Sequence, residues 1–158
     1  MFEIQNTKEI PLLRVNAHVF KHSKFGCTHL HLDCDSTEKA FSVAFRTIPK
    51  DHSGIAHILE HTVLCGSEKF PVRDPFFMMT RRSLSTFMNA MTYPDITAYP
   101  FATLNDKDYR NLLSVYLDAA FFPNIDELDF MQEGHRFELI KDGDKEKLAL
   151  KGVVYNEM

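Results

Sequence analysis

The sequence predicts an α+β domain in which helices pack on a mixed, largely antiparallel sheet. Three observations lead to this class. Apolar and polar residues alternate in several short segments, other segments repeat apolar residues at helical spacing, and the two kinds do not alternate regularly. Strict alternation of strand and helix would favour a parallel sheet instead. The 158 residues are enough for one domain with its own core.

Strands are expected first along the chain. Alternating residues and a run of β-branched and aromatic side chains predict them at residues 12–20, 27–33 and 40–46. Pro49 lacks the amide hydrogen that a sheet needs, so it ends the third strand. A helix over about residues 54–64 is expected next, ended at Gly66. Asp51 and Ser53 precede this helix and can cap its first amides.

The rest of the chain is expected to mix helices with strands. The clearest helix covers residues 105–122, because Asn105 can cap it and apolar residues recur along it at helical spacing. Its apolar stripe consists of Leu112, Leu113, Tyr116, Leu117 and Ala120. The other expected elements are a loop at 67–75, a helix at 75–87, a strand at 88–103 interrupted by Pro94 and Pro100, a short helix at 126–133, a strand at 135–141, a turn at 141–144 and the start of a helix at 150–158.

Composition and charge exclude several classes of function. The chain has 44% hydrophobic and 25% charged residues with a net charge of −4, as in an ordinary globular protein. It lacks the basic patch that is typical of nucleic-acid binding. No apolar run approaches the roughly 20 residues that span a membrane. We therefore expect neither nucleic acid nor a membrane as a partner.

The compartment is less tightly constrained. The first residues show neither the basic and apolar regions of a secretory signal nor the Arg-rich composition of a transit peptide. Three cysteines at uneven spacing indicate a reducing compartment rather than a disulfide scaffold. We expect a cytoplasmic protein if the source is bacterial. The alternative is the mitochondrial matrix or a plastid, after removal of a transit peptide.

The segment at 57–61, which reads HILEH, carries the strongest chemical signal. It is H-x-x-E-H, the inverted form of a zinc-protease signature. On a helix, His57 and His61 project from one face and Glu60 lies beside them. Two neutral imidazoles can hold Zn²⁺, and the carboxylate can take a proton from water during amide hydrolysis. Catalytic zinc needs a third protein ligand, which spacing alone does not choose among the downstream acids.

Further motifs surround this segment. They read LHLD at 30–33, AFSVAFRT at 40–47, GIAHILEHTVLCGS at 54–67, FPVRDPFF at 70–77, SL at 83–84, FMNAMT at 87–92, YPFAT at 99–103, QEG at 132–134 and KGVVYNEM at 151–158. In this order they resemble the N-terminal catalytic domain of M16 (pitrilysin/insulinase-type) zinc metallopeptidases, and within that family the presequence protease-like branch. The resemblance covers nearly the whole chain.

The resemblance implies a fold and a set of site residues. The fold is LuxS/M16 metallopeptidase-like, with residues 1–158 forming the N-terminal part of a catalytic domain that is incomplete at its C-terminus. The implied site residues are Glu60 as the general base, His57, His61 and Glu157 as ligands of Zn²⁺, and Asn89 and Ala90 on the edge strand that receives the substrate backbone. Main-chain pairing at such an edge binds peptides without demanding one sequence.

The implied activity is that of a zinc-dependent endopeptidase acting on short unstructured peptides. Full activity is expected to need the remainder of the family's two-half clamshell. The alternatives are a non-catalytic peptide-binding or scaffold module, an inactive fragment of the larger peptidase, or a zinc-dependent lyase on a related fold. Cys27, His29, His31 and Cys34 suggest a second zinc site, but alternation points Cys34 away from the others and favours packing or surface roles.

Overall fold

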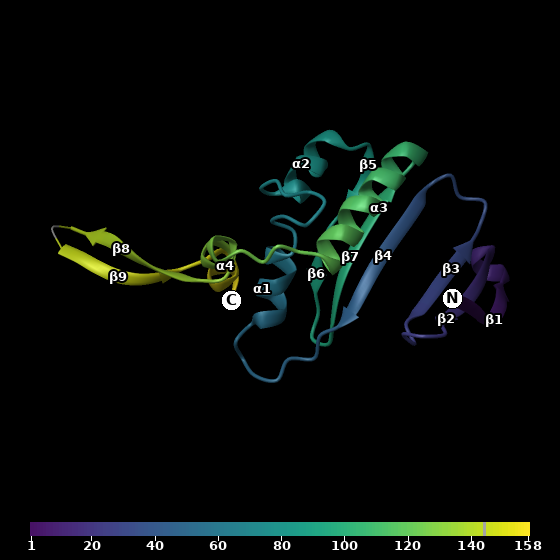
Figure 1. The fold of residues 1–158 in the computed structure, drawn as a ribbon, viewed down its shortest axis with the longest axis horizontal. Helices are drawn as coiled ribbons and strands as arrows, with labels where there is room; N and C mark the ends of the chain where they lie inside the picture. Colours follow the sequence, from purple (N-terminus) through teal and green to yellow (C-terminus); the bar gives the residue numbers. More distant parts are fainter. Residues whose placement is uncertain (144) are drawn as a thin grey trace. The chain divides into compact units, whose positions relative to one another are not determined.

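The computed structural model describes residues 1–143 and 145–158 and confirms the α+β class (Figure 1). Every pair of neighbouring strands in the described part runs antiparallel. The contacts divide the chain into two compact units, Met1–Thr37 and Glu38–Met158. The H-x-x-E-H segment lies in the second unit, which the later paragraphs describe by itself.

The unit Met1–Thr37 is a three-stranded sheet in the order β1-β2-β3. Its elements are β1 (Phe2–Ile10), the 3-10 turn η1 (Pro11–Leu13), β2 (Val15–His22) and β3 (Thr28–Asp33). β3 agrees with the strand expected at 27–33. The sequence does not predict β1, whose residues are nearly all exposed and lack a clear pattern. The strand expected at 12–20 begins later, because Pro11 opens the 3-10 turn and Arg14 then adopts a left-handed φ of 53°.

A four-stranded sheet forms the centre of the unit Glu38–Met158. Its strands are β4 (Lys39–Arg46), β5 (Ser85–Met88), β6 (Met91–Thr92) and β7 (Ile96–Thr103). β7 is central, with β4 along one side and β5 and β6 in succession along the other. The strand expected at 40–46 is confirmed. The interrupted strand expected at 88–103 is instead the last residue of β5, followed by β6 and β7.

Pro100 explains why β5 and β6 are separate. Asn89 and Ala90 lie between these strands, opposite the middle of β7, and the amide of Asn89 donates to the carbonyl of Pro100 at 3.1 Å. In a strand, the nitrogen and the carbonyl of one residue point to the same neighbour. The position where Pro100 lacks an amide hydrogen therefore also faces Asn89, and the ladder breaks there.

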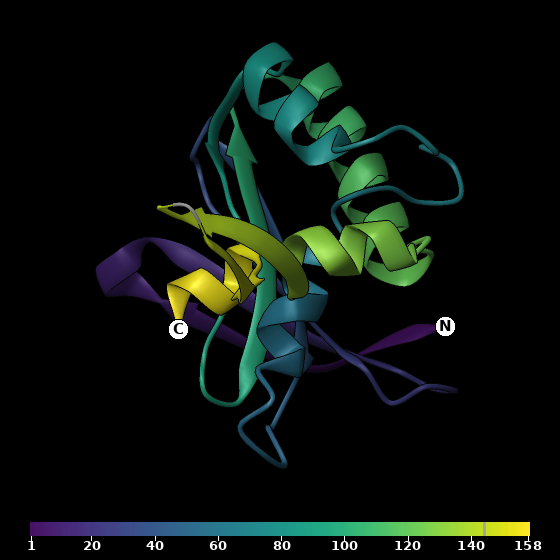
Figure 2. The ribbon, with the colours of Figure 1, turned by 90° about the vertical axis from the view of Figure 1, so that its left-hand side faces the viewer.

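The helix α3 (Asp106–Phe121) lies along one face of this sheet, as two views at right angles show (Figures 1 and 2). The core forms between the helix and β7. It contains Leu112 and Tyr116, which are 0% and 1% exposed, together with Tyr99 and Phe101 of β7 and Val63.

The start of α3 and much of its apolar stripe agree with the sequence. The side chain of Asn105 accepts hydrogen bonds from the amides of Lys107 and Asp108, which confirms its expected role as the N-terminal cap. The stripe is rotated, however, because Val115 and Ala119 are buried. Three of its expected members, Leu113, Leu117 and Ala120, are only half-buried.

Two other helices differ from expectation at their ends. The helix α2 (Pro75–Arg82) is shorter than the helix expected at 75–87, because Ser83 is extended and leads into β5. The helix α1 (Ile55–Thr62) has Gly54 as its N-cap residue, with no side-chain cap. The expected caps are wrong: Asp51 instead accepts hydrogen bonds from the amide and hydroxyl of Ser53.

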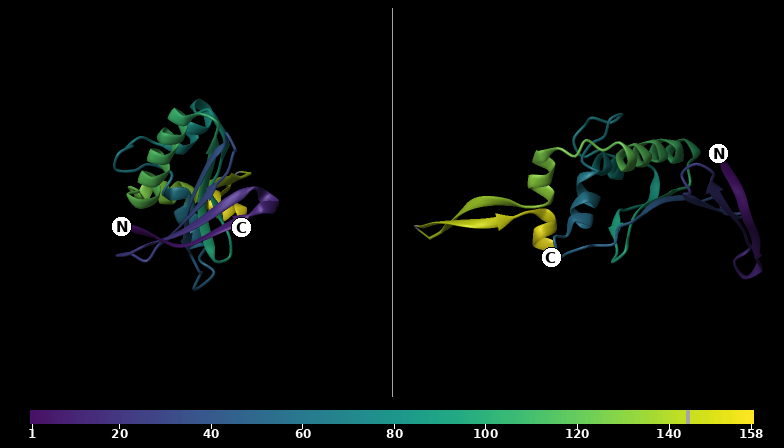
Figure 3. Two further views of the ribbon diagram at one scale, coloured as in Figure 1. Left: turned by 90° about the vertical axis from the view of Figure 1, so that its right-hand side faces the viewer. Right: turned by 60° about the horizontal axis from the view of Figure 1, so that its bottom comes forward.

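The C-terminal part consists of α4 (Glu127–Glu133), the hairpin β8 (Arg136–Asp142) and β9 (Lys145–Lys151), and α5 (Val153–Glu157). The hairpin extends away from α4 and α5 and then returns the chain, so that the two helices lie in contact (Figure 3). The sequence predicts α4 and β8 but not β9. The expected turn at 141–144 lies partly outside the described residues, and α5 occupies part of the helix expected at 150–158. No helix among residues 1–143 and 145–158 is long and apolar enough to cross a membrane.

Candidate metal centre

The helix α1 presents His57 and His61 on one face, one turn apart. Their ring centroids are 4.9 Å apart and the rings meet edge to face at 74°. Glu60, which is 6% exposed, completes a group whose ligand atoms all lie within 4.8 Å of one another. Within the described part of the chain, this is the one group of three or more His, Cys, Asp or Glu that meets so closely. The helix therefore brings together the residues that the motif predicts.

Glu157 brings a second carboxylate to the two imidazoles. Its Oε2 lies 3.4 Å from Nε2 of His57 and 3.9 Å from Nε2 of His61. Tetrahedral zinc with bonds of about 2.0–2.1 Å holds two ligand atoms about 3.3–3.4 Å apart. The contact with His57 fits that spacing, and a small side-chain movement would shorten the contact with His61. The donor set thus fits Zn²⁺ with three protein ligands and a fourth position open.

The short helix α5 is held in place by its neighbours. Val154 is fully buried at 0% exposed, and the amide of Asn156 donates to the carbonyl of Gly152. The side chain of Met158 lies against Gly54 at the start of α1, where an added Cβ would meet its Sδ at 3.1 Å. Gly54 also has a φ of 69°, a left-handed conformation that favours glycine. This packing places Glu157 beside the imidazoles of α1.

Glu133, at the end of α4, is a site residue that reasoning from the motif missed. Its Oε2 lies 2.9 Å from Nδ1 of His61, and the residue is 8% exposed. An ionised carboxylate only accepts hydrogen bonds, so Nδ1 carries the proton and Nε2 keeps its lone pair for a metal. The sequence signal for Glu133 is the QEG motif at 132–134, which is part of the family resemblance but has no role assigned to it in the sequence analysis.

Asn89 and Ala90 lie at a free edge of the sheet. Both sit between β5 and β6, which pair on one side with β7 and have no other strand partner in the described part. The helix α1 contacts β6 and β7, so this edge runs beside the candidate metal centre. The hydroxyl of Tyr116 donates to the carbonyl of Asn89 at 3.3 Å and fixes the backbone at the break.

Burial keeps the nearby thiol and phenol neutral. Desolvation, together with the nearby carboxylates of Asp129, Glu133 and Asp74, raises the pKa of Cys65 to about 12. Burial, followed by the charge of Glu60, raises the pKa of Tyr99. A neutral thiol is a poor nucleophile. The chemistry of the site therefore falls to water and to the carboxylates and imidazoles.

The structure does not bring the donor atoms of Cys27, His29, His31 and Cys34 together as a close group. Its histidines lie in a row on the first unit, where the rings of His29 and His31 stack at 6.5 Å and those of His18 and His31 at 6.0 Å. Both cysteines are exposed and free. The rings lie side by side rather than converging on one point, in line with the surface roles that alternation favours.

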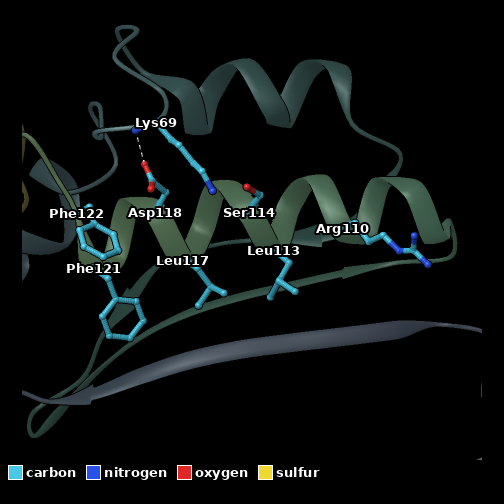
Figure 4. A pocket seen from close by; sticks show the side chains of 8 residues that line it. All are labelled: Lys69, Arg110, Leu113, Ser114, Leu117, Asp118, Phe121 and Phe122. Carbon is cyan, nitrogen blue, oxygen red and sulfur yellow. Dashed lines mark hydrogen bonds between the residues drawn. The ribbon is translucent and has the colours of Figure 1, made fainter.

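An open cavity of about 440 Å³ lies elsewhere, along α3 (Figure 4). Its lining consists of Lys69, Arg110, Leu113, Ser114, Leu117, Asp118, Phe121 and Phe122. The leucines and Phe121 point to one side, whereas Asp118 accepts a hydrogen bond from the amide of Lys69 at 2.8 Å. This lining offers one carboxylate and no imidazole or thiol, so it holds no metal-ligand set.

Comparison with known proteins gives a consistent result. A family model described as "Insulinase (Peptidase family M16)" matches residues 46–149. The chain is 55% identical over 159 residues to the mitochondrial presequence protease of Candida albicans, and 54% identical over 158 residues to that of Mus musculus. Each match covers 99% of this chain and 15% of the relative. The chain thus spans about 15% of the length of these relatives.

A solved structure supports the fold. The crystal structure of pitrilysin is similar over 80% of this chain and 14% of that chain, with a TM-score of 0.66. The sequences are 21% identical over this match, so the similarity concerns the fold alone. It agrees with an arrangement in which helices pack on an antiparallel sheet.

Proposed function

We propose, from the premise that this chain belongs to the insulinase family of peptidases (family M16), that residues 1–158 form the N-terminal part of a zinc-dependent catalytic domain. The observation that carries this proposal is the convergence of Glu157 on His57 and His61, at 3.4 and 3.9 Å. A carboxylate from a distant helix joins the two imidazoles, as a site with two histidines and one glutamate requires.

Four side chains divide the chemistry. His57, His61 and Glu157 bind the ion, which supplies Lewis-acid chemistry when it is bound. Glu60 is buried beside them, takes a proton from the attacking water and then donates it to the leaving amine. Glu133 holds the ring of His61 in the tautomer that keeps Nε2 free. No side chain forms a covalent intermediate in this scheme.

The substrate class is short, unstructured peptide. The edge formed by β5 and β6 offers backbone groups to an extended peptide, which would add a strand next to α1. Asn89 and Ala90 lie at the break in this edge. The amide of Asn89 donates to the carbonyl of Pro100, and the amide of Ala90 donates to Oδ1 of Asn89. A folded protein cannot present such a strand without first unfolding, so unstructured peptides are favoured.

The longer relatives suggest what surrounds this part. Because the chain spans about 15% of their length, we expect the remainder of a two-half enzyme as a partner for full activity. The matched relatives are named as mitochondrial, which supports the mitochondrial matrix as the compartment. The main expectation, a cytoplasmic protein, draws no support from these names.

The test is cleavage of a labelled unstructured peptide by the purified chain with zinc. Glu60→Gln should lower the rate by about 10²–10⁴-fold while zinc binding persists, since general acid–base catalysis contributes that much. The matched control is Glu127→Gln, the same exchange at an exposed position. Zinc binding without cleavage would favour a binding module or a dependence on the remainder. Undiminished cleavage by Glu60→Gln would show that Glu60 is not the base.

A further inference from the structure

A line of side chains leads from the loop before α2 to His61. The guanidinium Nη2 of Arg73 donates a hydrogen bond to Oε1 of Gln132. The amide Nε2 of Gln132 donates to Oε1 of Glu133 at 2.8 Å, and Oε2 of Glu133 lies 2.9 Å from Nδ1 of His61. The line joins three segments that are distant in sequence, and it ends on a residue of the candidate metal centre.

The chemistry of each group fixes the direction of this line. A guanidinium can only donate, so the oxygen end of the Gln132 amide must face Arg73. The amide's other end then presents N–H groups to Glu133, whose ionised carboxylate can only accept. Both oxygens of Glu133 are thereby assigned, one to Gln132 and one to the Nδ1–H of His61. The amide of Gln132 thus holds one oxygen of Glu133 and leaves the other to face the imidazole.

We propose that Arg73 and Gln132 are positioning residues that hold Glu133, and through it the tautomer and ring orientation of His61. This inference rests on the proposed metal-binding role of His61. Ligand histidines depend on the group that accepts their second N–H, and loss of that group typically weakens metal binding 10–100-fold. Gln132 and Arg73 stand one and two steps further out. We therefore expect their loss to weaken zinc binding by about threefold to tenfold.

The surroundings of Arg73 make it a suitable start for the line. Its side chain is 71% exposed and its Nε lies 3.5 Å from the carboxylate of Asp74. Surface ion pairs of this kind contribute little by themselves. Arg73 instead orients the side-chain amide of Gln132, because its guanidinium donates to the amide oxygen and leaves the NH₂ end to face Glu133. Arg73 and Gln132 also border a cavity of about 320 Å³, so water can replace the guanidinium if it is removed.

The first measurement uses the metal-free protein. Long-range ¹H–¹⁵N spectra of the imidazoles distinguish a proton on Nδ1 from one on Nε2. In the wild type, His61 should carry its proton on Nδ1. In Gln132→Met, which keeps the length of the side chain but removes both hydrogen bonds, the Nε2–H form should become populated. An unchanged His61 spectrum in Gln132→Met would overturn the proposal.

The second measurement is zinc affinity, by competition with a chelator. Gln132→Met and Arg73→Met should each weaken binding by about threefold to tenfold, and Arg73→Lys should recover part of the loss because lysine can donate to Gln132. Arg73→Met should add nothing in the Gln132→Met background, because both act through one line. Arg81→Met, at an exposed position of α2, is the matched control and should bind as the wild type does.

The outcomes separate the two proposals. If the wild type binds no zinc, the proposed function fails. If the wild type binds zinc and the variants at 73 and 132 bind it equally well, the positioning role is overturned while the proposed metal site is not. The same conclusion follows if the losses of zinc affinity in the two single variants simply add in the double variant. Circular dichroism and thermal unfolding of the metal-free variants verify that each is folded before its affinity is compared.

Discussion

Replacing Glu133 by glutamine tests the contact that links α4 to the metal centre. Glutamine has the same shape, but it has one acceptor oxygen where glutamate has two. If that oxygen faces His61, the new NH₂ group meets the NH₂ of Gln132, and two donors oppose each other. If the amide turns, its NH₂ faces Nδ1 of His61 and favours the tautomer with Nε2 protonated. The first arrangement leaves one hydrogen bond of the line unmade, and the second places a proton on the Nε2 that would otherwise bind zinc.

The expected effect follows from zinc-linked stability. With free zinc at 100 times the wild-type Kd, binding stabilises the fold by about 2.7 kcal/mol. A 10–100-fold loss of affinity, typical for a group that supports a metal-bound histidine, leaves about 1.4 or 0.4 kcal/mol at the same zinc concentration. A domain of this size changes its Tm by about 2–4 °C per kcal/mol. The zinc-dependent rise in Tm should therefore be about 3–9 °C smaller in the variant.

The assay is thermal unfolding with and without zinc at one fixed free concentration. Glu127→Gln is the control, because it makes the same exchange on the same helix at an exposed residue. The zinc-dependent shift should be that of the wild type in this control. If Glu133→Gln shows the full shift as well, then the 2.9 Å contact does not support His61 in metal binding, and the reasoning from geometry is refuted.

Three further predictions concern the core, a cap and a thiol. Leu112→Ala should lower the free energy of unfolding, measured by chemical denaturation, by about 2–5 kcal/mol, because the leucine side chain is fully buried. Leu128→Ala is the control and should change that free energy little, because Leu128 is 73% exposed. Asn105→Ala should cost about 1 kcal/mol in that measurement, since two amides of α3 lose their acceptor. Cys65 should react with a thiol reagent at pH 8 only on unfolding, after the two exposed cysteines, because burial raises its pKa to about 12. Its proton is kept in the folded state and lost from the unfolded chain near pH 9.0. The free energy of unfolding should therefore fall as the pH rises above 9.0, by at most about 1.4 kcal/mol per pH unit from this thiol. The check is to measure the free energy of unfolding against pH for the wild type and for Cys65→Ala. The same pH dependence in both proteins would contradict the prediction.

The local parts of the fold could be predicted where one pattern dominates. Alternation identifies β3 and β4, and Asn105 caps α3 as expected, because each depends on neighbouring residues alone. β1 escapes prediction since its residues are almost all exposed, and β9 because its polar sequence pairs only with β8. The breaks at Arg14 and Pro100 depend on backbone conformation and on the partner strand. Such features appear only once the strands are paired.

The candidate metal centre likewise has one part that the sequence predicts and another that it does not. The spacing of His57, Glu60 and His61 on one helix suffices to bring them together, because helical geometry sets the position of a residue three or four places away. No comparable rule connects His61 to Glu133 or Glu157. Those contacts depend on where α4 and α5 pack, so sequence spacing could not choose them, and the choice of Glu157 came from resemblance. In the structure Glu157 lies 3.4 Å from His57, and Glu133 contacts His61.

The hairpin between α4 and α5 explains why spacing fails as a guide to the third ligand. Its strands pair in register from Asp142 and Lys145 near the tip to Arg136 and Lys151 at the base. An antiparallel hairpin keeps its two ends adjacent whatever its length, because each added residue on one strand is matched on the other. The separation between Glu133 and Glu157 along the chain is therefore free to vary while their separation in space stays fixed. The proposed metal centre thus depends on the pairing at the base, where the chain leaves α4 and enters α5, and not on any particular number of residues between the two carboxylates.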